Sequence, residues 1–314
     1  MKANRTIILL LLAAVSLQSC ATYGKFTEPV LDVQFSDSIK SLGWREMFRD
    51  TCLQKLIDTA LVRNSDYGIA LLRIEQAEQR LTEARLAYLP GASAAPEASW
   101  SGTSSVQPVY NLGLEASWEL DLRGELTARK RLAQSSLEEM RLEGQAVRTR
   151  LICSIAQTYY SLLALDRKVE ISEQTIVNWS KSVQVLEALK LAGRSNDIAV
   201  LQAKAKMLNL EASTEALKGQ VLYTEQILCT LVGVTRRTIE RGSILEQDFP
   251  TLENGIPLDY IGARPDVIAS QKRLAQAFYA TEIANAAFFP SLRLSGSAGW
   301  TNYSGGTVFD PMAL

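Results

Sequence analysis

A heptad-like pattern of apolar and small residues runs through the middle of the chain, over about residues 125–191. The steps alternate between four and three, with one extra residue between Leu151 and Ile155, which is the pattern of a packed, supercoiled helix. No proline lies between Pro108 and Pro250 to interrupt it. We predict one water-exposed helical rod, about 100 Å long from the helix rise. Its seam consists of Ala133, Leu137, Met140, Gly144, Val147, Leu151, Ile155, Thr158, Leu162, Leu165, Val169, Ser172, Ile176, Trp179, Val183 and Leu186.

A shorter helix precedes the long one, and another follows near the end of the chain. The first runs from about residue 50 to residue 89, where Pro90 stops it. The last begins at Pro265, because proline suits a first helical turn and Asp266 complements the helix dipole there. The apolar positions of the first helix include Leu53, Leu56, Ile57, Ala60, Leu61, Leu71, Leu72, Ile74, Ala77, Leu81 and Ala84.

The long helix is predicted to reverse direction at residues 192–197. Gly193 can end it in a left-handed conformation, and Ser195 or Asn196 can cap a returning helix. The returning helix reaches about Val232, and an irregular connection with several Gly and Pro residues follows it. Its apolar residues are Ile198, Leu201, Ala205, Leu208, Ala212 and Tyr223.

Just before the long helix, the period of the pattern changes from helical to two. Apolar and polar residues alternate over residues 111–122, which predicts a strand with one apolar and one polar face. A weaker alternation over residues 92–100 predicts a partner strand, with residues 101–109 as the loop between them. Near the end of the chain, Leu292, Leu294, Ala298 and Trp300 predict another such strand.

The last helix and strand repeat the first ones at an offset of 200 residues without a gap. The repeat includes the proline that ends the helix and the tryptophan of the strand, which chance matches of helical alanines would not reproduce. We therefore predict an internal duplication. The aligned pairs are Ile69 and Ala269, Arg73 and Arg273, Gln76 and Gln276, Ala77 and Ala277, Ala84 and Ala284, Ala87 and Ala287, Pro90 and Pro290, and Trp100 and Trp300.

The first 19 residues have the pattern of an export signal. A short basic start precedes an apolar core, residues 7–15, that is too short for a permanent membrane helix. The sequence LQSC, which ends at Cys20, resembles a bacterial lipoprotein box, so we expect the Cys20 thiol to be lipidated. An ordinary secretory signal with an incidental cysteine is the other interpretation. Residues 20–43 lack periodicity and are interpreted as a lipid-anchored tether.

Composition excludes several kinds of chemistry. The 314 residues carry a net charge of −1, which gives no reason to expect a nucleic-acid partner. Histidine is absent, which removes Ser-His-Asp catalysis, Cys-His catalysis and histidine metal sites, and we expect no cofactor. Cys52, Cys153 and Cys229 are isolated in the sequence, and we expect them to be small buried apolar side chains.

One set of carboxylates is a candidate for catalysis. Glu115, Glu119 and Asp121 would project from one strand face, where their spacing could support acid–base chemistry. The polar face of a half-buried strand explains them more simply. We therefore expect that the protein is not an enzyme.

A series of motifs resembles the TolC-like outer membrane factor family, specifically the lipoprotein branch that serves tripartite efflux pumps of the RND type. Trp44, Phe48, Asp50 and Asn64 begin the series. It continues with RLAYLP at residues 85–90, WELDLRG at 118–124, RPDV at 264–267 and ANAAFFPS at 284–291. The order of these pieces is more specific than any one of them. The chain departs from the family at Arg123, where an aromatic residue is usual.

The resemblance implies a mainly α fold with a small β part. Long helical hairpins would form an α-barrel, and the strands would contribute to a shared trimeric transmembrane β-barrel in the outer membrane. The implied function is a passive conduit that exports drugs or other small toxic compounds from Gram-negative bacteria. The implied partners are two further copies of the chain, a periplasmic adaptor protein and an inner-membrane pump. Gly193, Arg194 and Ser195 would be the tip that contacts the adaptor.

The strand count also requires assembly, because three or four strands per chain cannot close a barrel and the smallest known barrels need about eight. The length of the best strand, roughly ten residues, suits a transmembrane barrel. The side chains expected to face lipid are Leu112, Leu114, Trp118, Leu120, Leu292 and Leu294.

The patterns together divide the chain into eight segments. They are a lipoprotein signal peptide (1–19), a tether (20–43), a first periplasmic helix (44–90), a first strand pair (91–122), a long helical hairpin (123–232), an irregular equatorial connection (233–263), the helix of the second repeat (264–290) and the start of a second strand pair (291–314).

A structural coiled-coil lipoprotein that spaces the outer membrane would also explain the long helix, although it has no use for amphipathic strands. In addition, only 24 residues follow Pro290. We expect that the second strand of that pair and a second hairpin, with the family's aperture residues, are missing, so that this is a truncated reading frame or a fragment.

Overall fold

The computed structural model describes residues 26–27, 43–101, 107–235, 238–247, 262, 264–301 and 307–310. The chain forms two compact units. The first consists of Met1–Val33, Arg73–Glu143 and Ile261–Leu314, and the second of Gln34–Leu72 and Gly144–Tyr260. The predicted signal peptide, Cys20 and nearly all of the predicted tether lie outside the described residues.

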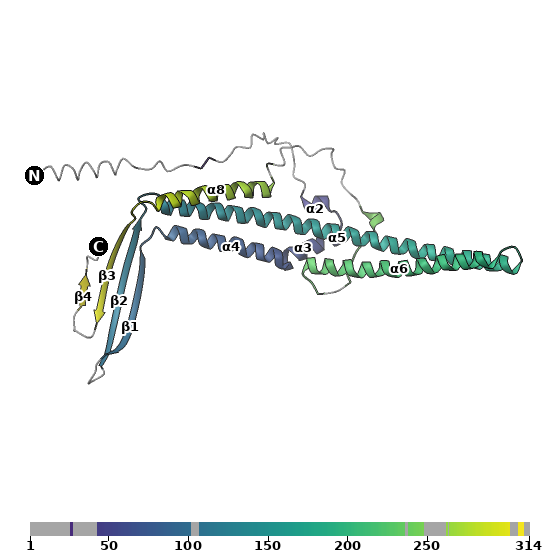
Figure 1. Ribbon diagram of the computed structural model, residues 1–314, viewed down its shortest axis with the longest axis horizontal. Coiled ribbons are helices and arrows are strands. Elements are labelled where there is room, and N and C mark those ends of the chain that lie inside the picture. Colours follow the sequence, from purple (N-terminus) through teal and green to yellow (C-terminus); the bar gives the residue numbers. More distant parts are fainter. Residues whose placement is uncertain are drawn as a thin grey trace, which may run out of the picture. The chain divides into compact units, whose positions relative to one another are not determined.

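The predicted long helix is helix α5 (Glu125–Leu191), which contributes to both units (Figure 1). Every position of the predicted seam is buried or partly buried, as a packed seam requires. The start of the helix is fixed by Asp121. Its two carboxylate oxygens accept hydrogen bonds from the backbone N–H groups of Leu126 and Thr127, at 3.1 and 3.0 Å, and one also accepts the Thr127 hydroxyl. These bonds satisfy donors that have no partner within a first turn.

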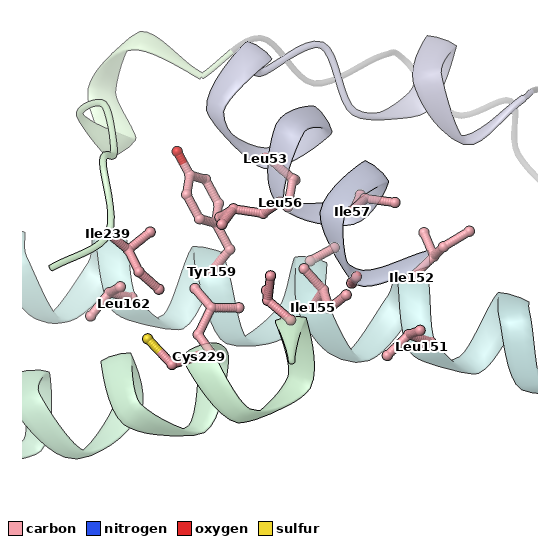
Figure 2. Packing of buried hydrophobic residues seen from close by; sticks show 14 of the residues in the cluster. Leu53, Leu56, Ile57, Leu151, Ile152, Ile155, Tyr159, Leu162, Cys229 and Ile239 are labelled. Atoms are coloured by element: carbon pink, nitrogen blue, oxygen red, sulfur yellow. The ribbon is translucent and has the colours of Figure 1, made fainter. Parts of the chain in front are cut away.

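The second unit is built around one apolar core. The short helix α2 (Trp44–Met47) precedes α3 (Thr51–Arg63), which packs on α5 and on α6 (Asp197–Val232). Figure 2 shows Tyr159 and Ile155 of α5 in the middle of this core. Its fully buried side chains include Leu53, Ile57, Ile155, Tyr159, Leu162, Leu163, Leu228 and Val232.

The predicted helix over residues 50–89 is in fact two helices, α3 and α4 (Ser65–Leu86). Asn64 between them is extended, with φ −67° and ψ 125°. Its side-chain oxygen accepts the N–H of Tyr67 in the first turn of α4, and its amide donates to the carbonyl oxygen of Leu231 in α6. The break thus arises because one asparagine caps a new helix and ties it to a distant one, which periodicity does not reveal.

Helix α6 forms as predicted, but its buried face is not the predicted one. The predicted residues Ile198, Leu201, Leu208 and Tyr223 are exposed, whereas the buried positions include Val200, Ala203, Leu228, Cys229 and Val232. The helix carries apolar residues on two faces, and only one of them meets α5. The expectation of buried cysteines is likewise correct for Cys229 and wrong for Cys153, which is exposed, while Cys52 is partly buried.

In the first unit, α5 lies between α4 and α8 (Pro265–Ala286), as the ribbons of Figure 1 also show. Apolar contacts of Ala77 and Leu81 with Leu137 join α4 to α5. As predicted, Pro265 stands in the first turn of α8 and Asp266 follows it. The ring of Phe26 packs at a tilt against those of Phe278 and Tyr279 of α8, whose centroids lie 5.5 and 6.3 Å from its own.

The strands of this unit form one antiparallel sheet of β1 (Gly91–Ser101), β2 (Gln107–Leu120), β3 (Leu292–Thr301) and β4 (Thr307–Asp310), in that order (Figure 1). The predicted loop over residues 101–109 is therefore shorter, because residues 107–109 pair with residues 99–101. Pro108 is tolerated there because the described part of β3, which reaches Asn111 of β2, makes no pair with it.

The expectation that the second strand of the last pair is missing is wrong for the part of it that β4 forms. Residues 307–310 pair with residues 297–300 of β3. Thr307, Val308 and Phe309 are β-branched or aromatic, the types that favour strands. A run of 4 residues is too short for alternation alone to identify it as a strand.

The bounds of the helices follow the predicted offset, since α4 spans residues 65–86 and α8 spans residues 265–286. The duplication itself stays a prediction. The described part of the irregular connection contains one short 3-10 helix, η1 (Ile244–Glu246). Among the described residues, no helix has the length and apolar character needed to cross a membrane.

The end of α6 generates a first prediction. Gly233 has φ +74°, and a Cβ atom added to it would lie 2.5 Å from the carbonyl oxygen of Arg63. Gly233→Ala should therefore lower the free energy of unfolding by more than the about 1–2 kcal/mol of a left-handed conformation alone. Gly219→Ala is the matched control, because nothing lies within 4 Å of its added Cβ. In a helix, that change should stabilise by about 0.5–1 kcal/mol. Thermal unfolding of the detergent-solubilised protein compares them, and equal stability of both variants would contradict the assignment.

Candidate functional site

The register of the sheet places the apolar positions of different strands on one face. Residues directly opposite in an antiparallel pair share a face. Leu112, Leu114, Trp118 and Leu120 of β2 lie opposite Trp300, Ala298, Leu294 and Leu292 of β3, in that order. On the other side, Leu112 and Leu114 lie opposite Pro96 and Ala94 of β1. Two alternations separated by almost 200 residues in the sequence therefore combine into one surface, which we call the apolar sheet face.

This apolar sheet face is not covered by the described part of the chain. Leu114 at its centre is 51% exposed, and Leu112, Trp118, Leu292 and Leu294 are also exposed. Leu120 is partly buried at the end of the strand. A contiguous apolar surface of this kind marks a site for a membrane or another protein. The structure thus brings together all six of the residues expected to face lipid, while their contact with lipid stays a prediction.

The opposite face of the sheet is polar. Glu97, Glu115 and Glu119 occupy it, and Arg293 lies directly opposite Glu119 with their charged atoms 3.3 Å apart. The third member of the predicted carboxylate set is not on this face, because β2 ends at Leu120 and Asp121 caps α5. The expected grouping of Glu115, Glu119 and Asp121 is therefore wrong, since the free N–H groups of the helix hold Asp121.

Polar contacts fix the junction between strands and helices. The indole N–H of Trp118 donates to the carbonyl oxygen of Tyr88 at 3.0 Å, and the Tyr88 hydroxyl lies 2.9 Å from that of Thr127. The guanidinium of Arg123 lies 3.4 Å from the ring centre of Phe289. Arg123 stands where the resembling family usually has an aromatic residue, and the stacking of its planar cation on Phe289 provides a comparable flat contact.

The helical tip is a tightly hydrogen-bonded reversal. Gly193 has φ +71°, and the N–H groups of Gly193 and Arg194 donate to the carbonyl oxygens of Lys190 and Leu189, the pattern that commonly ends a helix at a glycine. Asn196 then caps α6, because its side-chain oxygen accepts the N–H of Ala199 at 2.9 Å. Of the two predicted caps, the structure selects Asn196.

The surroundings of the tip are held by ion pairs and expose apolar side chains. Lys190 pairs with Asp197, and Lys204 pairs with Glu187 at 2.5 Å, so that both pairs join α5 to α6. Leu191 is 89% exposed, and Ile198 and Leu201 are exposed beside it. The predicted tip residues Gly193 and Arg194 are exposed, and Ser195 is partly buried. Their contact with an adaptor stays a prediction.

Two partly buried polar networks in the second unit were not predicted from the sequence. In the first, the Asp50 carboxylate accepts hydrogen bonds from Tyr159, Gln247 and the N–H groups of Cys52 and Leu53. Partial burial alone would raise the pKa of Asp50, but these bonds outweigh burial and hold the pKa below its ordinary value. Burial and the adjacent Asp50 carboxylate raise the pKa of Tyr159, so its hydroxyl stays a donor.

In the second network, Arg241 binds Asp166 of α5 through two nitrogen atoms, at 2.5 and 3.2 Å, and Glu225 of α6 at 2.7 Å. Glu225 also accepts the N–H of Ile239 at 2.8 Å. Burial opposes the charge, but the two carboxylates raise the pKa of Arg241. Both networks therefore join the connection that follows α6 to the helices of the second unit.

Comparison with known proteins gives a consistent result. The sequence profile of the family described as outer membrane efflux protein matches residues 56–234, which is more than half of the chain. The chain is 28% identical over 306 residues to the cation efflux system protein CusC of Escherichia coli, and this match covers 90% of the chain and 65% of CusC. It is 26% identical over 283 residues to the pyoverdine export outer membrane protein OpmQ of Pseudomonas putida, covering 85% and 60%.

Solved structures agree in fold. A crystal structure of CusC matches with a TM-score of 0.77 and 24% identity, covering 92% of this chain and 71% of that one, which shows the fold alone. The open state of the Neisseria gonorrhoeae MtrE outer membrane channel matches with a TM-score of 0.75 and 26% identity, covering 91% and 70%. The predicted mainly α fold with a small strand part is confirmed. The chain spans less than two thirds of the length of the CusC and OpmQ sequences.

Proposed function

Because the chain belongs to the outer membrane efflux protein family, we propose that it acts as the outer-membrane channel component of a tripartite efflux system. The observation that carries this proposal is the apolar sheet face, which one register builds from β1, β2 and β3 and which the described chain leaves exposed. In a transmembrane barrel, a face of this kind contacts the hydrocarbon of the bilayer.

The sheet also explains why the proposal includes several copies of the chain. The four strands among the described residues leave two edges, and unpaired backbone groups at an edge are costly in lipid. The smallest known barrels need about eight strands. The exposed apolar face of α6, with Leu201, Leu208 and Tyr223, provides further surface for packing between copies. A homotrimer, as the family resemblance implies, would share one barrel and one helical tube.

The conduit itself is proposed to be passive. The family and the relatives are channel proteins, and we assign no reaction to this chain. A periplasmic adaptor and an inner-membrane pump would supply the energy and choose the cargo. The printed names of relatives refer to cations and to pyoverdine, so cargo differs within the family. We therefore propose small toxic compounds, including drugs, as a class and no single substrate.

A structural spacer lipoprotein is the second candidate. Helix α5, with 67 residues and a buried seam, would suit a rod that spans the periplasm. A spacer, however, has no use for four paired strands with one apolar face. The two candidates differ in whether the sheet enters the membrane.

Substitutions on adjacent residues of β2 test this difference. Leu114→Arg should place a charge on the lipid side of the barrel, at a cost of about 2–4 kcal/mol near the middle of a bilayer. Glu115→Arg, the matched control, changes the polar face of the same strand. We expect Leu114→Arg to abolish efflux-dependent resistance and the protease-resistant outer-membrane form, and Glu115→Arg to retain both. Normal insertion of both variants would contradict a lipid-facing sheet and favour the spacer.

We further propose that the tip formed by Gly193, Arg194 and Ser195 contacts the adaptor. The tip immediately follows α5, whose other end adjoins the sheet in the sequence. The exposed backbone at Gly193 permits close approach of a partner, and nothing lies within 4 Å of a Cβ added there. Leu191 and Ile198 add an exposed apolar border, and Arg194 adds a positive charge.

Variants of the tip test this contact in cells that depend on the protein for resistance. Gly193→Trp should abolish resistance and chemical crosslinking to the adaptor, while expression and trimer formation persist. Gly193→Asn is the matched control, because asparagine tolerates the left-handed conformation and stays small. Arg194→Glu, which has no backbone constraint, should weaken the crosslink several-fold. Full resistance and full crosslinking in Gly193→Trp would exclude the tip as the docking site.

Lipidation of Cys20 is proposed from the sequence alone, because Cys20 lies outside the described residues. Several acyl chains would anchor the protein firmly, since each buried methylene contributes about 0.8 kcal/mol. Metabolic labelling with a fatty acid should tag the wild type and Cys52→Ala, and it should spare Cys20→Ala. Equal labelling of the wild type and Cys20→Ala would refute the lipid anchor.

A further inference from the structure

Three aromatic rings form a cluster on α8 that is separate from the two apolar clusters of the described residues. Phe278 and Tyr279 follow each other in the helix, and their rings meet edge to face with centroids 5.5 Å apart. The ring of Phe26 completes the cluster, and its centroid lies 5.5 Å from that of Phe278 and 6.3 Å from that of Tyr279. Tilted and edge-on arrangements, at separations of about 4.5–7 Å, are those that aromatic pairs prefer.

The cluster joins two distant parts of the sequence. Phe26 lies in the predicted tether, whereas Phe278 and Tyr279 lie in the second half of α8, and all three belong to the first unit. Their side chains are partly buried, while Thr27, the residue after Phe26, is exposed. A single ring of the tether is therefore held against two rings of the helix. An aromatic side chain buries a large apolar area, so one ring is enough to hold an extended segment on a helix.

The corresponding positions of α4 are not aromatic. At the offset of 200, Phe278 and Tyr279 correspond to Glu78 and Gln79. Glu78 forms an ion pair with Arg141 of α5 at 2.8 Å, and Gln79 is exposed. The polar contacts between α8 and α5 involve other residues of α8. The aromatic pair is therefore specific to the helix that the tether contacts, and it is a feature of that contact.

We propose that Phe278 and Tyr279 form the docking site of the N-terminal tether, and that the bound Phe26 limits how far the lipid anchor at Cys20 lies from α8. The inference rests on the proposed lipidation of Cys20 and on the proposed insertion of the sheet into the membrane. The occupant of the docking site is a residue of the same chain, and its ring contacts both aromatic residues of α8.

The lengths of chain on the two sides of the cluster agree with an anchor at the membrane surface. Phe26 is the sixth residue after Cys20, and six residues of extended chain span at most about 20 Å. Helix α8 continues for eight residues beyond Phe278, which is about 12 Å, and β3 begins at Leu292 after a short turn. The acyl chains can therefore reach the level at which the sheet would enter the bilayer while Phe26 stays bound.

Without the docking site, the anchor would be far less confined. The first described helix after Cys20 is α2, which begins at Trp44. Extended chain from Cys20 to Trp44 would span about 80 Å. The contact of Phe26 thus shortens the reach of the anchor about fourfold, from about 80 Å to about 20 Å. The docked tether would hold the second-repeat helix close to the membrane.

Limited trypsin digestion of the lipidated, full-length protein in detergent tests the docking site. Lys25 directly precedes Phe26, and cleavage after Lys25 releases the lipidated N-terminus, which mass spectrometry detects. A protease needs an accessible, extended segment, so a bound Phe26 should protect this bond. Phe278→Ala should accelerate the cleavage several-fold. Phe288→Ala, the matched control, should leave it unchanged, because Phe288 is 85% exposed.

A double variant separates loss of docking from a general loss of structure. Adding Phe278→Ala to Phe26→Ala should cause no further acceleration of the cleavage, because both substitutions remove the same contact. Further acceleration in the double variant would overturn the docking site. Equal cleavage of the wild type and Phe278→Ala would do so as well.

Photocrosslinking in outer membranes tests the limit on the anchor. With the photoreactive residue benzoylphenylalanine at position 278, we expect a crosslink within one chain to the tryptic peptide that begins at Phe26. The same probe at position 277, which is exposed on another face of α8, is the negative control. Deleting residues 22–24 leaves about 10 Å of chain between Cys20 and Phe26, so the crosslink should fall several-fold. Deleting residues 31–33, beyond Phe26, should leave it unchanged.

The outcomes separate this inference from the proposed function. A crosslink from position 278 to any other peptide would overturn the docking site, and an undiminished crosslink after deletion of residues 22–24 would overturn the limit on the anchor. If resistance and trimers persist without the crosslink, only the docking site is wrong. If the crosslink forms in a protein that neither inserts its sheet nor confers resistance, the docking site holds and the proposed channel fails.

Discussion

The burial of one continuous seam along α5 is the constraint on which the rest of this protein depends. Most of the stability of a helix in a protein comes from tertiary packing of one face, and intrinsic propensity contributes less. A helix of 67 residues therefore needs partners along its whole length. The chain supplies α4 and α8 near its start, α3 and α6 near its middle, and α6 up to the tip. Each neighbouring helix thus covers a different part of the seam.

The contacts that these helices make with α5 differ in chemistry. The middle of α5 is held by an apolar core around Tyr159, where removal of water provides the main driving force. Where α8 meets α5, the contact depends on Glu139 and its ligands Arg273 and Gln276. Arg273 is exposed, although Glu139 is buried, and an ion pair that is open to water on one side adds little net stability while its charge-assisted hydrogen bonds are exacting in geometry. The apolar core thus holds the helices together, and the contacts of Glu139 fix how α8 is aligned along α5.

Periodicity in the sequence predicted the long helix and the apolar sheet face. It located α5 to the residue, because the seam and the charged faces repeat over many turns, and it identified the apolar sheet face, because the alternation in β2 and β3 is clean. It failed where a single side chain decides the structure. Asn64 divides a helix through two hydrogen bonds of its side chain, and Asp121 leaves the strand to cap α5. The carboxylates that bind Arg241, those of Asp166 and Glu225, are 75 and 16 residues away in the sequence, and no local pattern reveals such pairs.

The outer edge of β1 has a consequence for how the sheet can grow. Within the described residues, β1 is an edge strand of 11 residues, and Pro96 lies near its middle. Proline has no N–H group to donate, so this edge is a template with one missing donor. A strand that pairs with this edge keeps all of its hydrogen bonds only in an alignment that needs no N–H donor at position 96. Misaligned strands, including those of other unfolded chains crowded nearby during export, lose a hydrogen bond there. Pro96 thereby limits the alignments in which an added strand keeps every hydrogen bond.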